Sequence, residues 1–479
     1  MQMPRDIGPF HIIGIGGIGM SAIAEILLAK GYQVQGSDQK ESANVRRLRA
    51  KGIRVFVGHD AANLEGAQQV VISTAVKQTN PELGAARAKG LPIIRRAEML
   101  AELMRLYATV SVTGTHGKTT TTSLISTIFE NAKLDPTVIT GGIINAWGSN
   151  ARLGQGRWMI VEADESDGTF TRLPTEIGVV TNIDPEHLDY FGSVEAMHRE
   201  YEAFFRNIPF FGLAVTCIDH PVAREMVDRL HLRRDGRPVL TYGTREEADL
   251  VLRAVRAEGR STVIDADLGA RVKGGARAIR GWTVPMPGEH NALNALAAIA
   301  VAAEAGIPDE TIRAGLAAFS GVKRRFQLTG TWNGVQIFDD YGHHPAEIAA
   351  VLTAARAGAR GNVVAVVEPH RYTRVRDLFE EFAACFAAAD SVVVAPLYSA
   401  GEAPIEGIHP KALADAIRAT GHAAVATIDD PRELVAIVER GTRPGDMVIV
   451  LGAGNSTEWA HALPEWLAAS EPRRAGSAL

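Results

Sequence analysis

A short turn at residues 114–119 has the residue types that bind phosphate. It reads Gly-Thr-His-Gly-Lys-Thr, and position 112 is Val where the full phosphate-loop motif has its first glycine. Glycines let backbone N–H groups point into one concavity, a lysine reaches the outer phosphates, and a threonine hydroxyl can bind Mg²⁺. The turn therefore predicts a nucleotide site. Its candidate residues are Gly114, Thr115, His116, Gly117, Lys118, Thr119 and Thr120.

Carboxylates follow the apolar run at 158–161. Glu162, Asp164, Glu165 and Asp167 come in quick succession. Beside a phosphate loop, such a cluster supplies the hard oxygen ligands that Mg²⁺ prefers. Glu162 is the best candidate because it lies nearest to the end of the expected strand. The alternative is a solvated acidic loop.

A histidine follows the next apolar run, at 178–181. His187 stands among Asp184, Glu186 and Asp189, at the same expected edge of the sheet. A single histidine is often structural, but these acidic neighbours favour a role for His187 as a metal ligand or as a neighbour of phosphate.

The N-terminal segment contains G-x-G-x-x-G at 14, 16 and 19, and Asp38 follows about 20 positions later. That arrangement is typical of a dinucleotide-binding unit and leaves open an NAD-dependent oxidoreductase. The same geometry holds any diphosphate at a helix N-terminus, and Asp38 could bind any ribose or sugar hydroxyl. Further polar residues follow the next expected strands. The candidates in this segment are Gly16, Gly17, Gly19, Asp38, His59, Ser73 and Thr74.

Two polar clusters mark the last third of the chain. One contains Asp340, Tyr341 and His343, and the other contains His370, Arg371 and Arg374. Guanidinium groups suit a carboxylate ligand, and the alternative is surface ion pairing with Asp377 or Glu380.

Two amides lie three residues apart at the start of an apolar helix. Asn291 and Asn294 would share one face of its first turn and could hydrogen-bond a purine. The alternative is helix capping.

Strand-like and helix-like runs alternate along the chain and must position these residues. The β-branched run at 109–113 predicts a strand before the phosphate turn, and residues 140–150 are expected to form a glycine-rich loop. In the last segment, the runs at 335–338, 346–355, 363–367, 374–388, 391–395 and 447–451 indicate a second doubly wound domain. We expect an α/β protein of three domains: a Rossmann-like domain at 1–107, a central phosphate-loop domain at 108–322 and a Rossmann-like domain at 323–479.

The composition of the chain argues against nucleic-acid-binding and membrane-bound classes of protein. The chain has 479 residues, 46% of them hydrophobic and 22% charged, with a net charge of −5. Nothing here favours nucleic acid or a membrane as a partner. Cys217 and Cys385 sit beside apolar residues without metal-ligand spacing, so we expect reduced thiols in a cytoplasmic protein.

Eight motifs together resemble one family, the Mur ligases. They occur in the family's order: GIGGIGMSAIAE, TGTHGKTTTT, EADESDGTF, TNIDPEHLDYF, PGEHNALNA, GVKRRFQ, DDYGHHPAEI and PHRYTRVRD. Within the family they are most similar to the branch that joins L-alanine to UDP-N-acetylmuramic acid. The resemblance implies that ATP phosphorylates the lactyl carboxylate and that the amine of alanine then attacks the acyl phosphate.

The resemblance also implies roles for single residues. Lys118 would neutralise the transferring phosphoryl group, Thr119 and Glu162 would hold one Mg²⁺, and His187 would help to hold a second. Asn291 and Asn294 would bind adenine, Arg325 would contact the γ-phosphate when the third domain closes, and Asp340 would tie that domain to the nucleotide. The glycine loop would bind the UDP-sugar. The implied alanine pocket consists of Tyr341, His343, His370, Arg371 and Arg374.

The sequence departs from the family pattern at two places. Many Mur ligases carry a carbamylated lysine on the helix after TNIDPEHLDYF, but here that stretch has no lysine, which fits the alanine-adding branch. The polar step at 454–457 has no explanation in the sequence. A ligase for a recycled cell-wall tripeptide remains an alternative, and we expect a monomer or a weak homodimer.

Overall fold

The computed structural model describes residues 7–73, 75–166 and 168–470. The chain divides into two compact units. One comprises Met1–Arg253, Asp265–Trp282 and Leu293–Ser320, and the other comprises Ala254–Ile264, Thr283–Ala292 and Gly321–Leu479.

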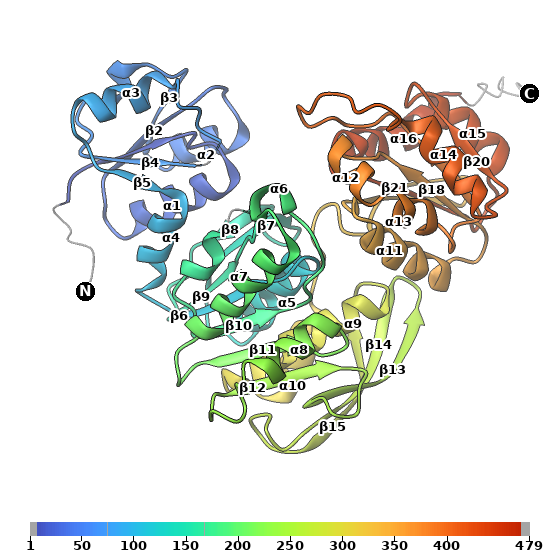
Figure 1. Cartoon of the computed structure of the whole chain (residues 1–479), viewed down its shortest axis with the longest axis horizontal. Coiled ribbons are helices and arrows are strands. Elements are labelled where there is room, and N and C mark those ends of the chain that lie inside the picture. Colours follow the sequence, from blue (N-terminus) through green and yellow to red (C-terminus); the bar gives the residue numbers. More distant parts are fainter. Residues whose placement is uncertain (1–6, 74, 167, 471–479) are drawn as a thin grey trace, which may run out of the picture. The chain divides into compact units, whose positions relative to one another are not determined.

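The N-terminal part is a parallel sheet in the order β3-β2-β1-β4-β5 (Figure 1). Its elements are β1 (Phe10–Ile13), α1 (Ile18–Ala29), β2 (Val34–Asp38), α2 (Ala43–Ala50), β3 (Arg54–Val57), η1 (Ala61–Leu64), β4 (Gln69–Ile72), α3 (Pro81–Ala88), β5 (Ile93–Arg95) and α4 (Arg96–Met104). Phe10 and Ile12 pack with α1, α2 and α4, whereas Ile13 packs with Leu83 of α3. Alternate side chains of one strand thus enter different cores, as in a doubly wound sheet.

The middle part contains a sheet of ten strands, in the order β15-β14-β13-β12-β11-β10-β6-β9-β7-β8. Its strands are β6 (Ala108–Thr113), β7 (Thr137–Ile144), β8 (Ser149–Arg152), β9 (Trp158–Glu162), β10 (Ile177–Val180), β11 (Leu213–Cys217), β12 (Val239–Gly243), β13 (Leu250–Glu258), β14 (Ser261–Leu268) and β15 (Arg277–Val284). Its helices are α5 (Lys118–Asn131), η2 (Thr169–Arg172), α6 (Leu188–Phe191), α7 (Val194–Asn207), α8 (Pro221–Arg229), α9 (Glu289–Glu304) and α10 (Asp309–Ala317). The strand predicted at 109–113 is confirmed as β6.

The prediction of a loop at 140–150 is wrong. Residues 137–144 and 149–152 form the antiparallel pair β7 and β8, with an irregular register between Ile139 and Ile144. Val138 and Ile139 also pair with β9, which holds the segment in the sheet despite its glycines. Long-range pairing therefore outweighs the low strand propensity of glycine here.

The last part contains six strands in the order β16-β17-β21-β18-β19-β20, and only β16 runs antiparallel to its neighbour. Its elements are β16 (Gln327–Trp332), β17 (Val335–Asp340), α11 (Pro345–Gly358), β18 (Val363–Val367), α12 (Tyr372–Asp377), α13 (Phe379–Ala384), β19 (Ser391–Val394), α14 (Pro410–Ala419), β20 (Val425–Thr427), α15 (Glu433–Gly441), β21 (Met447–Leu451) and α16 (Ser456–Ser470). Val363 and Ala365 pack with α11, α13 and α14, whereas Val364 and Val366 pack with α15 and α16. The predicted α/β class and its doubly wound C-terminal domain are confirmed.

The single helix predicted at 374–388 is wrong. Leu378 has φ −122° and ψ 30°, which ends α12 and begins α13. Phe382 of α13, and Phe386 just after it, are buried in the core of this sheet, so packing against the sheet holds the second helix.

A buried carboxylate explains the polar step at 454–457. Glu368, at the end of β18, accepts hydrogen bonds from the backbone N–H groups of Gly454, Asn455 and Ser456 at 3.0, 3.0 and 3.2 Å. These are donors at the start of α16 that no helical carbonyl can satisfy. Burial nevertheless raises the pKa of Glu368, since it opposes ionisation more strongly than these bonds favour it.

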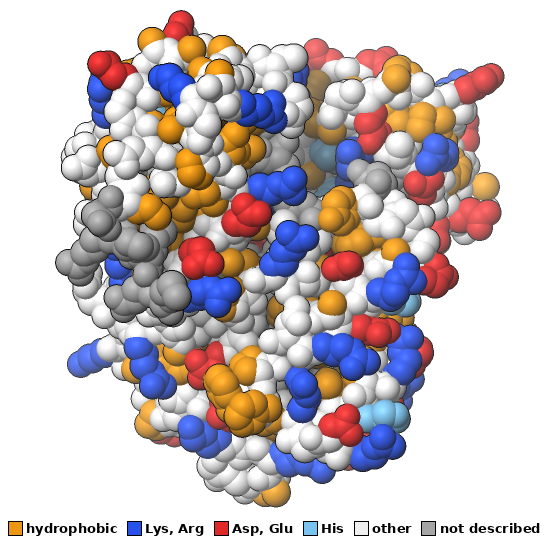
Figure 2. Space-filling model, turned by 60° about the vertical axis from the view of Figure 1, so that its left-hand side comes forward, with side chains coloured by type: hydrophobic (Ala, Val, Ile, Leu, Met, Phe, Trp, Pro, Cys, Tyr) orange, Lys and Arg blue, Asp and Glu red, His pale blue; other side chains and the backbone are white. Residues whose placement is uncertain are grey.

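No helix in the described ranges is long and apolar enough to cross a membrane. On the face that Figure 2 shows, Lys and Arg side chains are interspersed with Asp and Glu side chains.

We predict that Glu368→Ala lowers the free energy of unfolding by about 2 kcal/mol, because it leaves the buried N–H of Ser456 and the part-buried N–H groups of Gly454 and Asn455 without an acceptor. Denaturant unfolding measures this change. The matched control is the exposed Glu381→Gln in the same part of the chain, which should change stability by less than about 0.5 kcal/mol. Equal stabilities of the Glu368 and Glu381 variants would contradict the capping role.

Candidate functional site

The turn at 114–119 is held against the end of β10. Gly114 has φ +125°, and a Cβ there would lie 2.1 Å from Thr181 Oγ1. The Thr115 N–H donates to Asn182 O at 3.1 Å, and the His116 N–H donates to Asn182 Oδ1 at 2.7 Å. Gly117, with φ +81°, then begins α5. Only glycine fits the backbone at both positions, so the loop has one well-defined concave shape.

Lys118 lies half-buried at the start of α5, where its side chain turns back over the loop. Its Nζ donates to Gly114 O at 2.6 Å, Thr115 O at 3.0 Å and Glu165 Oε1 at 2.8 Å. Burial lowers the pKa of Lys118, but the carboxylate of Glu165 outweighs that effect and the pKa rises. The ammonium is therefore held charged inside the predicted phosphate site.

Thr119 and Glu162 lie together, as sequence reasoning expected of a metal site. The Thr119 hydroxyl donates to Glu162 Oε1 at 3.0 Å. The other oxygen, Oε2, accepts from the Thr140 hydroxyl at 2.8 Å and from the Gly141 N–H at 2.6 Å. Residues of β7 thus orient the carboxylate at the end of β9.

A second group of metal-ligating types surrounds Glu165. Its carboxylate, that of Glu186 and the His187 imidazole each offer an atom within 4.8 Å of the others. Burial raises the pKa of Glu165 to about 7, against the opposing effect of Lys118. Glu165 Oε2 is buried with no hydrogen-bond partner in the described part of the chain. This donor set fits a divalent cation such as Mg²⁺.

Sequence reasoning predicted His187 at this place but did not select Glu165 or Glu186. Both stood in the acidic clusters after β9 and β10. The missing signal was burial, since Glu165 is 2% exposed whereas the neighbouring Asp164 is exposed.

Asp184 holds two histidines beside the loop. Its oxygens lie 3.2 Å from His116 Nε2 and 3.1 Å from His220 Nε2. Burial opposes ionisation, but the hydrogen bonds from His116 and His220 prevail and lower the pKa of Asp184. Asp184 therefore supports the loop as an anion, and His220 was not anticipated from the sequence.

The carboxyl ends of the first sheet surround a cavity of about 710 Å³. Five of the predicted UDP-sugar residues line it: Gly17, Gly19, Asp38, His59 and Ser73. Gly16 lies next to it, where its N–H donates to Asp38 Oδ2 at 2.9 Å. Thr74 lies outside the described residues.

Two cations that sequence reasoning missed also line this cavity, Lys77 and Arg96. Arg96 follows β5 directly, and its guanidinium would lie 3.0 Å from a Cβ on Gly19. A basic residue after the fifth strand was the available signal, because all parallel strands of a sheet end at one edge. The cavity thus combines a helix N-terminus with positive charge, which suits a diphosphate.

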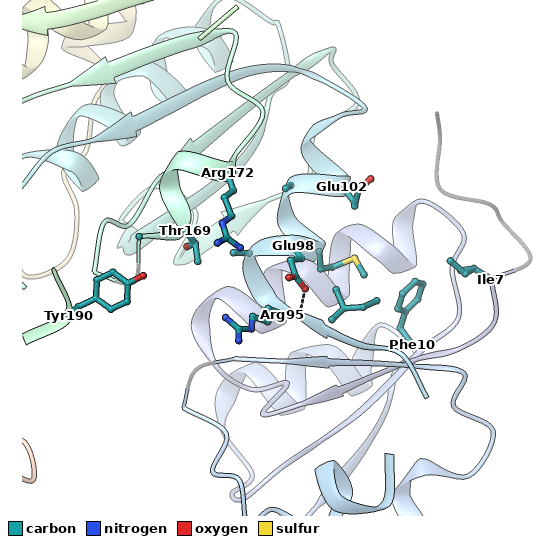
Figure 3. Close-up of a pocket in the computed structure, with 13 residues that line it drawn as sticks. Ile7, Phe10, Arg95, Glu98, Glu102, Thr169, Arg172 and Tyr190 are labelled. Carbon is teal, nitrogen blue, oxygen red and sulfur yellow. Dashed lines mark hydrogen bonds between the residues drawn. The ribbon is translucent and has the colours of Figure 1, made fainter. Parts of the chain in front are cut away.

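A second cavity, of about 410 Å³, lies between α4 and the segment from η2 to Tyr190 (Figure 3). Phe10 and Met99 contribute apolar wall, and Figure 3 shows Arg95 and Arg172 beside it. Glu98 accepts from the Arg95 N–H at 2.9 Å and so caps α4. None of the residues predicted from the sequence lines this cavity.

In the second unit, Asp340 organises the segment before α11. Its oxygens accept from the Phe326 N–H and the Gly342 N–H, both at 2.7 Å. Burial raises the pKa of Asp340 to about 6, although the charge of Arg325 opposes this rise. Arg325 lies 5.1 Å from the ring centre of Tyr341 and 3.7 Å from a carboxylate oxygen of Glu347.

The predicted amino-acid residues cluster around His370. Its ring centre lies 5.6 Å from that of His343 and 5.3 Å from that of Tyr398. Burial, together with the charges of His343, Arg374 and Arg371, lowers the pKa of His370 to about 3, so the imidazole is neutral at physiological pH.

The arginines have different neighbours from those weighed in the sequence. Arg371 Nε lies 2.9 Å from Glu402 Oε1, and Arg374 Nη1 lies 3.2 Å from His370 Nδ1. The predicted alternative partners were Asp377 and Glu380, whereas Asp377 pairs with Arg376.

The two amides of α9 are both buried. Asn291 donates to Pro287 O at 2.8 Å. Asn294 Oδ1 accepts from the Thr121 hydroxyl at 3.2 Å and lies 2.6 Å from where a Cβ on Gly117 would be. Asn294 therefore contacts the phosphate loop itself, whatever its role toward adenine.

Three domain models of one family match consecutive parts of the chain. They are the Mur ligase family catalytic domain at residues 9–108, the Mur ligase middle domain at 112–302, and the Mur ligase glutamate ligase domain at 324–454. The chain belongs to the Mur ligase family.

Curated relatives of this Mur ligase match it along almost its whole length. A protein of Mesorhizobium japonicum is 57% identical over 98% of this chain and 100% of its own length. A protein of Chelativorans sp. is 56% identical over the same shares. Both are named UDP-N-acetylmuramate–L-alanine ligase.

Solved structures share the fold. The UDP-N-acetylmuramate-alanine ligase of Thermotoga maritima has a TM-score of 0.77 and 27% identity, over 97% of this chain and 100% of that one. A murein peptide ligase of Psychrobacter arcticus has a TM-score of 0.66 and 22% identity, over 96% and 98%. A MurF ligase of Thermotoga maritima in complex with ADP has a TM-score of 0.61 and 19% identity, over 91% and 94%.

We predict that Glu165→Gln weakens binding of Mn²⁺, a spectroscopic substitute for Mg²⁺, by at least about 10-fold. The amide retains the volume of the side chain but removes the charge that faces Glu186 and His187. Electron paramagnetic resonance of the free ion measures the affinity. The exposed Glu225→Gln in the same unit is the control and should bind like the unchanged Mur ligase. Unchanged binding by the Glu165 variant would remove that residue from the metal site.

Proposed function

We propose that this Mur ligase is a UDP-N-acetylmuramate–L-alanine ligase, which consumes ATP and acts in the synthesis of peptidoglycan precursors. The observation that carries the proposal is the 57% identity, over 98% of the chain, to a relative of that name. The phosphate loop and the metal-ligating carboxylates around Lys118 support it, since a dehydrogenase needs neither. The family assignment thus favours the ligase over the NAD-dependent interpretation of the glycine loop.

The triphosphate of ATP binds at the turn before α5, and Lys118 supplies positive charge to the transferring phosphoryl group. An ammonium already held in place by Glu165 needs no reorganisation during the reaction, and such preorganisation is the main source of electrostatic catalysis. Asn291, Asn294, Arg325 and Asp340 are proposed to complete the ATP site. The MurF ligase that was solved with ADP has the same fold, which supports nucleotide binding by this architecture.

Thr119 and Glu162 would hold one Mg²⁺, and His187 would hold a second with Glu165 and Glu186. The orphaned oxygen of Glu165 and the close donor set around it fit that ion. A bound Mg²⁺ would neutralise phosphate charge. The protein residues orient these ligands: Thr140 and Gly141 hold Oε2 of Glu162, which leaves Oε1 facing Thr119 at the phosphate loop.

The UDP moiety is proposed to bind in the cavity at the edge of the first sheet, with its diphosphate near the N-terminus of α1. Lys77 and Arg96 add charge that the sequence prediction lacked. Tyr341, His343, His370, Arg371 and Arg374 are proposed to form the alanine pocket. The three predicted domains, with boundaries at 107/108 and 322/323, would divide these tasks among UDP-sugar, ATP and amino acid.

The chemistry proceeds in two steps. An oxygen of the lactyl carboxylate attacks the γ-phosphorus of ATP, and ADP leaves. The amine nitrogen of L-alanine then attacks the carbonyl carbon of the acyl phosphate, and phosphate leaves from the tetrahedral intermediate. Phosphorylation converts a poor electrophile into one with a good leaving group, so the enzyme mainly positions reactants and neutralises charge.

Phosphate release from ATP tests this function. The assay contains UDP-N-acetylmuramic acid and Mg²⁺, and it receives L-alanine, glycine, L-serine or the cell-wall tripeptide one at a time. We expect release that depends on the sugar nucleotide and is fastest with L-alanine. Release with the tripeptide alone would assign the protein to the recycling reaction, and release with none of these acceptors would refute the ligase assignment.

We predict that Lys118→Ala lowers the rate of that phosphate release by at least about 100-fold, because it removes one preorganised charge. Steady-state kinetics with all three substrates measure the loss. The control is Lys89→Ala, which removes an exposed lysine directly after α3. It should retain the full rate of phosphate release. A near-normal rate in the Lys118 variant would exclude the role given to its ammonium.

A further inference from the structure

A fully buried carboxylate lies behind the cavity of the first sheet but does not line it. Glu82, at the second position of α3, is 0% exposed, and so are Ser37 of β2 and His11 of β1. Asn80 caps α3 by accepting from the Glu82 N–H at 2.9 Å. The sequence prediction used neither Glu82 nor Ser37, and the proposed chemistry does not use them either.

Four donors meet the Glu82 carboxylate. Oε2 lies 2.5 Å from Ser37 Oγ and 3.2 Å from His11 Nε2. Oε1 accepts from the Asn63 amide at 2.6 Å and from the Asp60 N–H at 3.3 Å. Burial opposes ionisation, but the hydrogen bonds from His11, Ser37 and Asn63 outweigh it, so the pKa of Glu82 is lowered. An ionised carboxylate only accepts hydrogen bonds, so each of these neighbours must donate.

His11 lies between Gln35 and Glu82. The amide nitrogen of Gln35 donates to the carbonyl oxygens of Asn63 and Glu65 at 3.0 and 3.1 Å, which identifies it as nitrogen. It also faces His11 Nδ1 at 3.4 Å. His11 Nε2 faces Glu82 Oε2, which only accepts hydrogen bonds, so Nε2 carries a proton and donates it to Glu82.

The same reasoning reaches His59, which lines the cavity. A serine hydroxyl has one proton, and that of Ser37 is donated to Glu82. Ser37 Oγ also lies 2.9 Å from His59 Nδ1, so here it must accept. Glu82 Oε2, at 3.5 Å from the same nitrogen, is another acceptor. Both neighbours require a proton on His59 Nδ1, which leaves Nε2 of the neutral ring without one.

We infer that Glu82 is a positioning residue, which acts through Ser37 to hold His59 in the Nδ1–H tautomer and so presents Nε2 to the cavity as a hydrogen-bond acceptor. The ligand group that meets His59 is then a donor, an N–H or O–H group, and not a phosphate or carbonyl oxygen. This inference rests on the proposed function for the nature of the ligand. In a uridine diphosphate the donors are the imide N3–H of uracil and the ribose hydroxyls.

The first measurement needs no ligand. We expect the ¹⁵N chemical shifts of His59 in the full-length protein, recorded under conditions in which the ring is neutral and assigned with His59→Gln, to show a protonated Nδ1 and a bare Nε2. In Ser37→Ala the ring loses its nearer acceptor and keeps only Glu82 Oε2 at 3.5 Å, so the two nitrogens should become more alike as both tautomers are populated. A wild-type ring with its proton on Nε2 would overturn the inference, even if the enzyme is the proposed ligase.

The second measurement is calorimetric binding of UDP, 3-methyl-UDP and 2′-deoxy-UDP to the full-length protein. We expect one modified ligand to bind about 3- to 10-fold more weakly than UDP, because it lacks the donor that meets Nε2. That penalty should shrink in Ser37→Ala. Equal binding of all three ligands would overturn the ligand part of the inference. No binding of UDP would overturn the proposed function instead and leave the tautomer result standing.

Kinetics separate positioning from folding. Ser37→Ala and Glu82→Gln should raise KM for the sugar nucleotide by about 3- to 10-fold while kcat stays within about twofold, because the contact is remote from the reacting carboxylate. The exposed Glu65→Gln is the matched control and should behave as wild type. A fall in kcat that merely tracks lost folded protein, with KM unchanged, would assign Glu82 a purely structural role.

Discussion

The site in the first unit depends on how the phosphate loop is held against the end of β10. Three residues after β10 contact the loop at His116. Thr181 and Asn182 hydrogen-bond the His116 backbone, and Asp184 meets the His116 imidazole. A Cβ on Gly114 would lie 2.1 Å from Thr181 Oγ1 and collide with it. Only a glycine at position 114 therefore lets the loop approach the end of β10 this closely. Strand order places β10 beside β6, which makes the contact a consequence of sheet topology.

Buried carboxylates recur in this protein, and each meets a different set of donors. Glu82 is surrounded by four donors and its pKa is lowered, whereas Glu165 keeps an orphaned oxygen and its pKa is raised to about 7. Glu368 caps α16 with backbone N–H groups. A satisfied carboxylate rigidifies a fold, while an unsatisfied one retains capacity for a cation.

Much of the fold could be predicted because apolar periodicity reports burial. The strands at 109–113, 363–367 and 447–451 were found from their β-branched runs, which are buried on both faces. The prediction failed at 140–150 and at 374–388. In the first, glycines hid a strand that pairing with β9 holds, and in the second a helix breaks at Leu378 although its apolar spacing continues.

The sequence by itself determined the chemistry that this protein can offer: a glycine-flanked lysine, carboxylates after strands and paired arginines, in an order that identifies the Mur ligases. Tertiary structure alone decided which of these groups are buried, paired or aimed at a cavity. It brought Glu165 to Lys118, Glu402 to Arg371, and Glu82 to Ser37 across 45 positions. Residue type and spacing fix what a side chain can donate or accept, but its protonation and orientation depend on neighbours that only the folded chain supplies.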